Sequence, residues 1–255
     1  MSSAKALIVN ADDLGRTPGI NDGIFEAHER GLVTSATLMV AYPAAEKAAI
    51  RCETLPDLGI GLHVQLSGGT PVLPPEQLPS LVDAEGRLPK FPDGLGGAAP
   101  DEVMAEAKAQ FDRFLELCGR LPTHLDSHHH SHRNPMVCDA LIALARDHHL
   151  PIRNASPDVK ERVRQEGLPT NDHFVEKFFG EDARLEILLE VLRSLGPGIT
   201  EIMCHPAHVD EELRSSSSYA EQRQQELEIL TNADALQAVK DLGLRTANFS
   251  TAWCS

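Results

Sequence analysis

Residues 124–132 hold the chain's densest group of side chains that can bind a metal, with five of its twelve histidines in this one stretch. The stretch follows a helical pattern over residues 100–119, so we predict a short strand that runs into a loop. Alternate residues of a strand share a face, which would place His124, Asp126 and His128 on one side. Imidazole nitrogens and a carboxylate on one face suit a divalent metal ion. A solvated polar loop is the simpler alternative, but the density of histidines favours the metal.

Two adjacent carboxylates end the first predicted strand. Residues 6–9 are a continuous apolar run, typical of a strand buried on both faces, and Asp12 and Asp13 follow closely. Buried carboxylates are costly unless a cation compensates them. A helix N-cap and a turn would account for one aspartate, so a metal or acid–base role for the pair stands beside that interpretation. Both side chains can enter one pocket only if the chain bends between residues 10 and 15.

His63 lies in a strand predicted over residues 58–66. In a barrel, the strand's even-numbered apolar residues would meet the surrounding helices, and Gly61, His63 and Gln65 would line the interior. A lone histidine on a strand is usually part of the core. Here Gly59 and Gly61 leave space beside His63, which favours a functional site.

Two further predicted strands have polar side chains at their ends. The strand predicted over residues 199–204 is followed by His205, and Pro206 turns the chain out of the strand just after it. A short strand over residues 151–154 carries Arg153 near its end, where it is either a substrate contact or a surface charge.

Strands and helices alternate along the chain, which predicts an α/β fold. With 255 residues, a single domain over 1–255 is the simplest solution, and a (β/α) barrel typically needs about 250 residues. The carboxyl ends of its strands meet at one face, so Asp12, Asp13, His63, His128 and His205 should gather there. Residues 67–99 are rich in proline and glycine and are predicted to form a loop insertion over one end of the fold. Residues 155–180 are expected to be irregular.

Composition excludes several classes of function. The net charge of −15 argues against nucleic acid as a partner and fits a neutral or cationic small substrate. The five cysteines at 52, 118, 138, 204 and 254 lack zinc-finger spacing and are expected to be reduced thiols of a cytoplasmic protein. We expect neither a signal peptide nor a membrane segment.

Four motifs carry a resemblance to a known family: residues 9–15, the stretch Gly61-Leu62-His63, residues 123–130 and residues 203–206. Together they resemble the YdjC-like carbohydrate deacetylases, a group that includes the chitooligosaccharide deacetylases. The resemblance covers nearly the whole chain in order.

The resemblance implies a distorted, TIM-like (β/α) barrel, often a homodimer, that removes N-acetyl groups from amino sugars or short chitooligosaccharides. It implies Asp13, His63 and His128 as ligands of one divalent ion, with Mg²⁺ usually assigned. Two imidazoles and one carboxylate would equally suit Zn²⁺ or another transition metal.

The resemblance further implies Asp12 as the catalytic base toward water and His205 as the general acid toward the departing amine. Asp126 is better placed to orient a metal-binding histidine than to bind the metal itself.

Two other functions stay open. The spacing of His124, Asp126 and His128 also occurs in metal-dependent phosphoesterases, although such enzymes gather more ligands and a basic phosphate cradle that this sequence lacks. A carbohydrate-binding protein that holds a metal without chemistry is the third interpretation. The presence of Asp12 and His205 argues against it.

Overall fold

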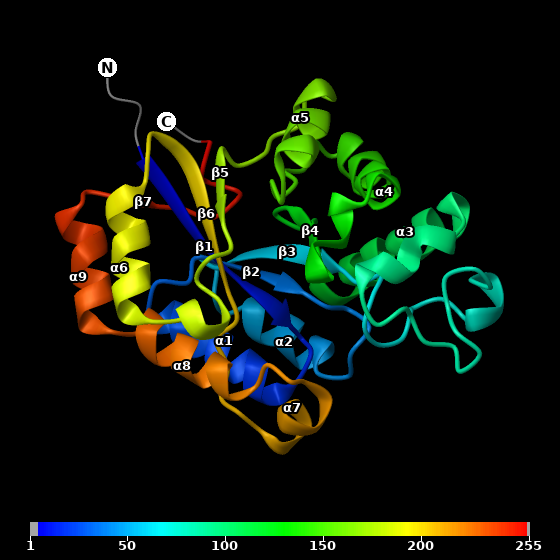
Figure 1. Cartoon of the computed structure of the whole chain (residues 1–255), viewed down its shortest axis with the longest axis horizontal. Coiled ribbons are helices and arrows are strands. Elements are labelled where there is room, and N and C mark those ends of the chain that lie inside the picture. Colours follow the sequence, from blue (N-terminus) through cyan, green and yellow to red (C-terminus); the bar gives the residue numbers. More distant parts are fainter. Residues whose placement is uncertain (1–4, 254–255) are drawn as a thin grey trace.

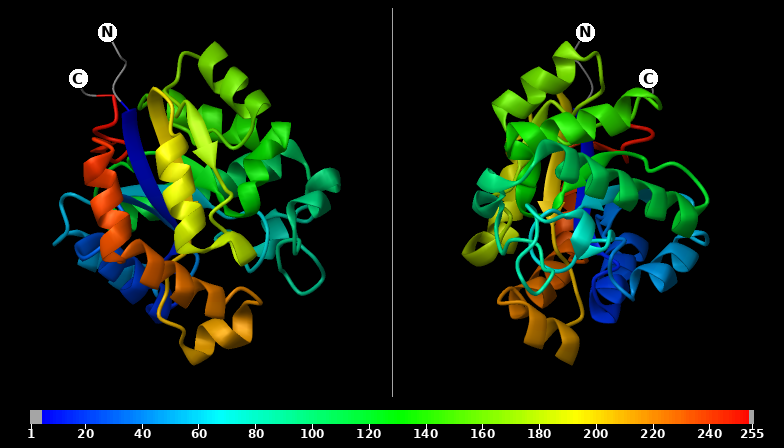
Figure 2. Two further views of the ribbon diagram at one scale, coloured as in Figure 1. Left: turned by 60° about the vertical axis from the view of Figure 1, so that its left-hand side comes forward. Right: turned by 90° about the vertical axis from the view of Figure 1, so that its right-hand side faces the viewer.

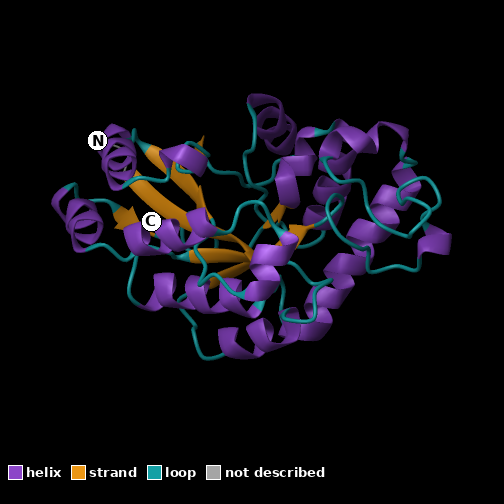
Figure 3. Cartoon of the chain, turned by 60° about the horizontal axis from the view of Figure 1, so that its bottom comes forward, coloured by secondary structure: helices purple, strands orange, loops and turns teal. Residues whose placement is uncertain are grey.

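Parallel strands form one curled sheet at the centre of the molecule, with helices outside it (Figures 1 and 3). The computed structural model describes residues 5–253. Within them the strand order is β4-β3-β2-β1-β6-β5, and β7 pairs with the start of β1. The strands are β1 (Lys5–Leu14), β2 (Ser35–Leu38), β3 (Gly59–Val64), β4 (Leu125–Ser127), β5 (His173–Val175), β6 (Gly198–Cys204) and β7 (Arg245–Thr246).

The helices cover the outer face of the sheet, and the turned views of Figure 2 show them on several sides of it. Helices α6 and α9 lie on one side and α3 and α4 on the other (Figure 1). The helices are α1 (Pro18–Glu29), α2 (Ala45–Cys52), α3 (Pro100–Cys118), α4 (Pro135–Arg146), α5 (Pro157–Gln165), α6 (Leu185–Ser194), α7 (Glu211–Ser216), α8 (Glu221–Leu230) and α9 (Ala233–Asp241).

Each long strand has an outer face under the helices and an inner face that lines the barrel. On β3 the predicted alternation is confirmed, because Ile60, Leu62 and Val64 belong to the main apolar core. On β1 the residues Leu7, Val9 and Ala11 join that core, whereas Ala6 and Ile8 join a second cluster with Phe249. The strand period of two therefore sends Asn10 and Asp12 to the inner face, above the second cluster.

The barrel is closed between β4 and β5 by irregular backbone instead of a ladder. Ile152 forms one bridge with Leu125, and its N–H donates to the carbonyl of Pro169 at 3.0 Å. Farther along, the N–H of Asp172 donates to the carbonyl of Ile199 at 2.8 Å. The strand predicted over residues 151–154 is thus only an isolated bridge. This gap makes the α/β fold a distorted, TIM-like barrel.

The expectation that residues 155–180 are irregular is wrong, since they contain α5 and β5. The signals of a helix start were present: the Ser156 side chain accepts the N–H of Val159 at 3.3 Å, and Pro157 occupies the first turn. The helix is nine residues long and mostly polar, with Val159 and Val163 as its buried residues. The apolar pattern of α5 is too weak to predict the helix from the sequence.

Residues 67–99 project beyond α3, on the side away from α6 and α9 (Figure 1). Their regular structure consists of two short 3₁₀ turns, Pro75–Gln77 and Pro92–Gly97. The buried carboxylate of Glu106 in α3 accepts the N–H groups of Val72 and Leu73 at 2.8 and 3.0 Å. These hydrogen bonds fix the base of the segment to the helix.

Two expectations concern the cysteines and the membrane. Cys52, Cys118, Cys138 and Cys204 are free thiols, as predicted, and Cys254 lies outside the described residues. Among residues 5–253, every helix is too short or too polar to cross a membrane.

Gly23 allows α1 to pack directly on the chain that follows β6. A Cβ atom at this position would lie 2.3 Å from the Cα atom of Ala207. We predict that Gly23→Ala lowers the free energy of unfolding by about 1–3 kcal/mol, because backbone overlap outweighs alanine's better helix propensity. Urea denaturation measures this, with Gly96→Ala as the control because its added methyl group meets no atom within 4 Å. Equal midpoints for the two variants would contradict the prediction.

Candidate active site

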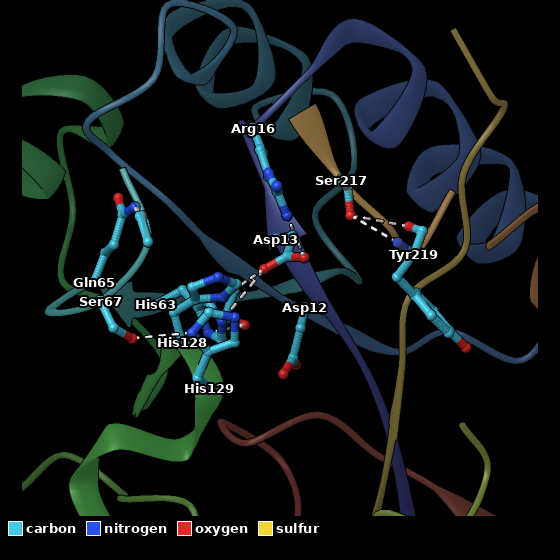
Figure 4. A network of polar contacts seen from close by, with 12 residues as sticks. Asp12, Asp13, Arg16, His63, Gln65, Ser67, His128, His129, Ser217 and Tyr219 are labelled. Carbon is cyan, nitrogen blue, oxygen red and sulfur yellow. Dashed lines mark hydrogen bonds and ion pairs between the residues drawn. The ribbon is translucent and has the colours of Figure 1, made fainter. Parts of the chain in front are cut away.

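Asp12 and Asp13 lie at a bend in β1, as predicted. Asp13 has a φ of 70°, in the left-handed region that aspartate tolerates better than most residues. The register of β1 against β2 shifts between Ala11 and Leu14. The bend sends two successive side chains into the same buried region, where Asp13 is directed toward His128 and Asp12 away from it (Figure 4).

Asp13, His63 and His128 gather at the carboxyl ends of β1, β3 and β4. Asp13 Oδ1 lies 3.0 Å from His128 Nδ1 and 3.6 Å from His63 Nε2. One ligand atom from each residue lies within 4.8 Å of the others. Although buried, Asp13 Oδ1 receives no well-aligned hydrogen bond from any residue between 5 and 253. Two imidazoles and one open carboxylate oxygen therefore fit a divalent ion.

Asp126 contacts the far side of the His63 ring. His63 Nδ1 lies 2.7 Å from Asp126 Oδ1, and a carboxylate can only accept, so the proton belongs on Nδ1. In the neutral ring, Nε2 then carries the lone pair and is directed toward Asp13. Burial alone would lower the pKa of His63, but Asp126, Asp12 and Asp13 raise it to about 8. The carboxylates around this ring thus favour a cation in the cluster.

Two arginines hold the other oxygen of Asp13. Arg223 Nη2 donates to Asp13 Oδ2, and Arg16 Nη1 lies 3.6 Å from the same atom. Burial alone would raise the pKa of Asp13, but Arg223 and His128 keep it well below its usual value. Asp13 is therefore ionised, with one oxygen held by arginine and the other open toward the histidines.

Arg153 occupies the barrel interior and has no exposed surface. Its guanidinium binds three carboxyl groups: Nη1 and Nη2 donate to Asp12 at 2.7 and 2.6 Å, Nε donates to Glu201 at 2.7 Å, and Nη1 lies 2.8 Å from Asp126. Neither of the two sequence interpretations, a substrate contact or a surface charge, matches a guanidinium that is buried and engaged in this way. We propose instead that Arg153 positions Asp12 and Asp126.

The Arg153 network sets the charge on its carboxyl groups. Burial alone would raise the pKa of Asp12, but the bidentate contact with Arg153 lowers it well below its usual value. Burial raises the pKa of Glu201 to about 8, so at neutral pH Glu201 is the protonated member. Asp12 stays ionised and fixed in direction, as a base toward water requires, although its arginine partner makes it a weak one.

His205 follows β6 with its side chain 11 % exposed and its backbone fixed. The fully buried Glu226 accepts the His205 N–H at 2.5 Å through Oε2, and Tyr219 OH donates to Oε1 at 2.5 Å. The rings of Tyr219 and Phe179 pack against the imidazole with centroids 5.8 and 5.3 Å away. Burial and the charge of Arg223 lower the pKa of His205 to about 3, so the ring is neutral in the free protein.

His124 and His132 serve packing. His124 is stacked on Phe249 with ring centroids 3.7 Å apart, and it fills the space that Gly61 leaves, since a Cβ there would lie 2.4 Å from its ring. His132 is fully buried, with Nδ1 against the Ser127 hydroxyl. The prediction that Gly61 leaves free space beside His63 is therefore wrong, because the ring of His124 occupies that space.

Three buried residues of the site were missed from the sequence: Glu201, Arg223 and Glu226. Glu201 had a signal, because an acidic residue inside an apolar strand needs a buried partner. Arg223 and Glu226 lie in α8, whose many charged residues resemble those of a solvated surface helix. Their contacts with Asp13 at the end of β1 and with the backbone of His205 after β6 place them in the interior.

Acidic and imidazole ligands at the strand ends of a distorted barrel are typical of proteins with a catalytic metal. The model of the family described as YdjC-like protein matches residues 6–241, and the chain therefore belongs to this family.

A carbohydrate deacetylase from Thermoanaerobacter pseudethanolicus is 41 % identical, covering 96 % of this chain and 98 % of its own. A chitooligosaccharide deacetylase from Proteus mirabilis is 38 % identical over the same shares. The crystal structure of an Enterococcus faecalis protein named for cellobiose-phosphate cleavage, 36 % identical, covers 98 % of this chain and 99 % of its own with a TM-score of 0.91.

Removal of the buried guanidinium tests the Arg153 network. Arg153→Met should lower the free energy of unfolding by about 3–5 kcal/mol, because carboxylates would be left buried without their cation. Chemical denaturation measures the loss. Arg146→Ala, which breaks the exposed 2.6 Å pair with Glu166, is the control and should cost less than about 1 kcal/mol. A stability of Arg153→Met close to that of the control would contradict the network.

Proposed function

We propose that this protein is a metal-dependent hydrolase that removes N-acetyl groups from amino sugars or short chitooligosaccharides. The observation that carries the proposal is the cluster of Asp13, His63 and His128, with the ionised Asp12 beside it and His205 at the neighbouring strand end. The names of the similar proteins, carbohydrate deacetylase and chitooligosaccharide deacetylase, support the same reaction.

Each residue of the cluster has a distinct role in the proposal. Asp13, His63 and His128 would hold one divalent ion, and Asp126 orients the His63 ring through Nδ1. Such an ion supplies Lewis-acid polarisation of the acetamide carbonyl and a more acidic water. Asp12 accepts the proton of the attacking water, and Arg153 fixes the direction in which its carboxylate can do so.

His205 is proposed to protonate the departing amine. Its pKa of about 3 in the free protein means that the ring must gain a proton after substrate binds. Negative charge that develops on the reacting carbonyl oxygen raises the pKa of a neighbouring imidazole. The Glu226 carboxyl lies 3.9 Å from His205 Nδ1.

The proposal extends to cofactor, location and assembly. Mg²⁺ is the ion that the family resemblance implies, and Zn²⁺ or another transition metal fits the two imidazoles equally well. A cytoplasmic homodimer is the proposed form, from the reduced cysteines and the family resemblance. The net charge of −15 supports a small sugar substrate and neither nucleic acid nor a membrane as partner.

Acetate release tests the proposed reaction directly. The purified protein, stripped of metal, is assayed against a panel of N-acetylated sugars of one to several units with added Mg²⁺, Mn²⁺, Co²⁺ or Zn²⁺. Metal-dependent acetate release from at least one sugar is expected. Hydrolysis of a chromogenic phosphate ester without acetate release would overturn the proposal in favour of a phosphoesterase. Sugar binding without turnover under every metal would favour a binding protein.

The role of His205 is separable from that of the metal. His205→Ala should keep the metal and lose rate on N-acetylated sugars by roughly 10²–10⁴, the contribution typical of a general acid. An activated acetate ester, whose leaving group needs no proton, should be affected much less. Parallel kinetics on both substrates with metal analysis make the comparison. Equal losses on amide and ester would count against the acid role.

A further inference from the structure

Exposed aromatic side chains flank the candidate active site. Among residues 5–253, the large apolar side chains with substantial exposure are Ile50, Phe91, Leu121, Phe179, Leu242 and Trp253. Two of the three aromatic ones contact histidines of the site: Phe179, 44 % exposed, contacts His205, and Phe91, 52 % exposed, contacts His129. Exposure of an apolar ring to water is unfavourable. Two exposed phenylalanines at one site therefore indicate a surface that a ligand covers.

Phe179 belongs to a fixed aromatic platform. Its ring is nearly parallel to Tyr219, with an interplanar angle of 16° and centroids 4.2 Å apart. The Tyr219 hydroxyl is held on both sides, since it donates to Glu226 at 2.5 Å and accepts the N–H of Gly180 at 2.9 Å. The platform therefore keeps its position next to His205 without a ligand.

Phe91 comes from the segment 67–99 and approaches the metal cluster through a different histidine. Its ring is tilted against His129 with centroids 5.5 Å apart, and His129 in turn lies 3.9 Å from His128. The segment is held at this place: Gly68 N–H donates to Pro89 O at 2.8 Å, and Leu88 N–H donates to Gly69 O at 3.0 Å. Both phenylalanines are thus presented by anchored backbone.

We propose that Phe179 and Phe91 are two sugar-binding subsites, one beside His205 and one beside His129. Phe179 stacks on the ring that carries the acetamide, and Phe91 stacks on a neighbouring ring of a longer substrate. The assignment rests on the proposed function, because the amine that His205 protonates is attached to the first ring. The faces of pyranose rings carry C–H groups with partial positive charge, which pack on the negative face of an aromatic ring.

The two subsites differ in which substrates they affect. Phe179→Ala should weaken binding of an N-acetylated monosaccharide and of its trimer by a similar factor, roughly 3- to 10-fold. Phe91→Ala should weaken the trimer by that factor and leave the monosaccharide unchanged. Phe179→Trp should retain affinity, whereas Phe179→Leu, which keeps apolar area without a flat ring, should not. Ile50→Ala, an equally exposed apolar change on α2 far from the site's ring contacts, is the matched control.

The test is calorimetric titration of each sugar into the metal-loaded protein at low temperature, beside acetate release on the same sugars. Binding that depends on Phe179 without acetate release would overturn the proposed reaction and leave the subsites standing. Acetate release by the wild type with unchanged sugar affinity in both alanine variants would overturn the subsites alone. An equal loss of affinity for the trimer and the monosaccharide in Phe91→Ala would also overturn the subsites. The remaining alternative is that these rings contact a second copy of the chain. Sedimentation velocity tests it, because a dimer that dissociates when either phenylalanine is replaced by alanine would overturn the subsites in favour of that contact.

Discussion

The buried guanidinium of Arg153 is the interaction on which the interior of the barrel depends. It lies in the gap where the sheet lacks a regular ladder and binds carboxyl groups from β1, β4 and β6. Without it, three buried acids would repel one another. With it, Asp12 stays ionised and Asp126 is held beside His63, while burial keeps Glu201 protonated. One cation thus compensates the polar interior and orients both the proposed base and a proposed metal ligand.

The bend at Asp13 divides the two aspartates between two environments. The left-handed φ of Asp13 turns its carboxylate toward the histidines, while Asp12 keeps the inner face of β1 and meets Arg153. A second arginine, Arg223, holds Asp13 through Oδ2. Each carboxylate therefore has its own arginine partner. Asp13 presents its other oxygen to two imidazoles, and Asp12 is a fixed, ionised carboxylate.

Local patterns predicted the strands β1, β3, β4 and β6 and the inner face of β3, because apolar runs and an apolar period of two can be recognised within a few adjacent residues. The bend in β1 followed from needing both aspartates in one pocket. The closure of the barrel by Ile152 and Pro169 and the burial of Arg223 and Glu226 could not be predicted, since they depend on segments far apart in the chain. The histidine stretch shows the same limit: His128 joins the candidate metal site, whereas His124 and His132 are packed in the interior.

Metal content and turnover of Asp12→Asn and Asp13→Asn test the division of roles most directly. Each change keeps the shape of the side chain and removes its charge and nearly all its basicity. Asp12→Asn should retain one metal per chain by elemental analysis and lose turnover by about 10²–10⁴ at saturating metal. Asp13→Asn should lose metal first, and excess metal should restore part of its rate. A metal-depleted Asp12→Asn beside a metal-replete Asp13→Asn would reverse the roles, and full activity in both would reduce the pair to a bend and a helix cap.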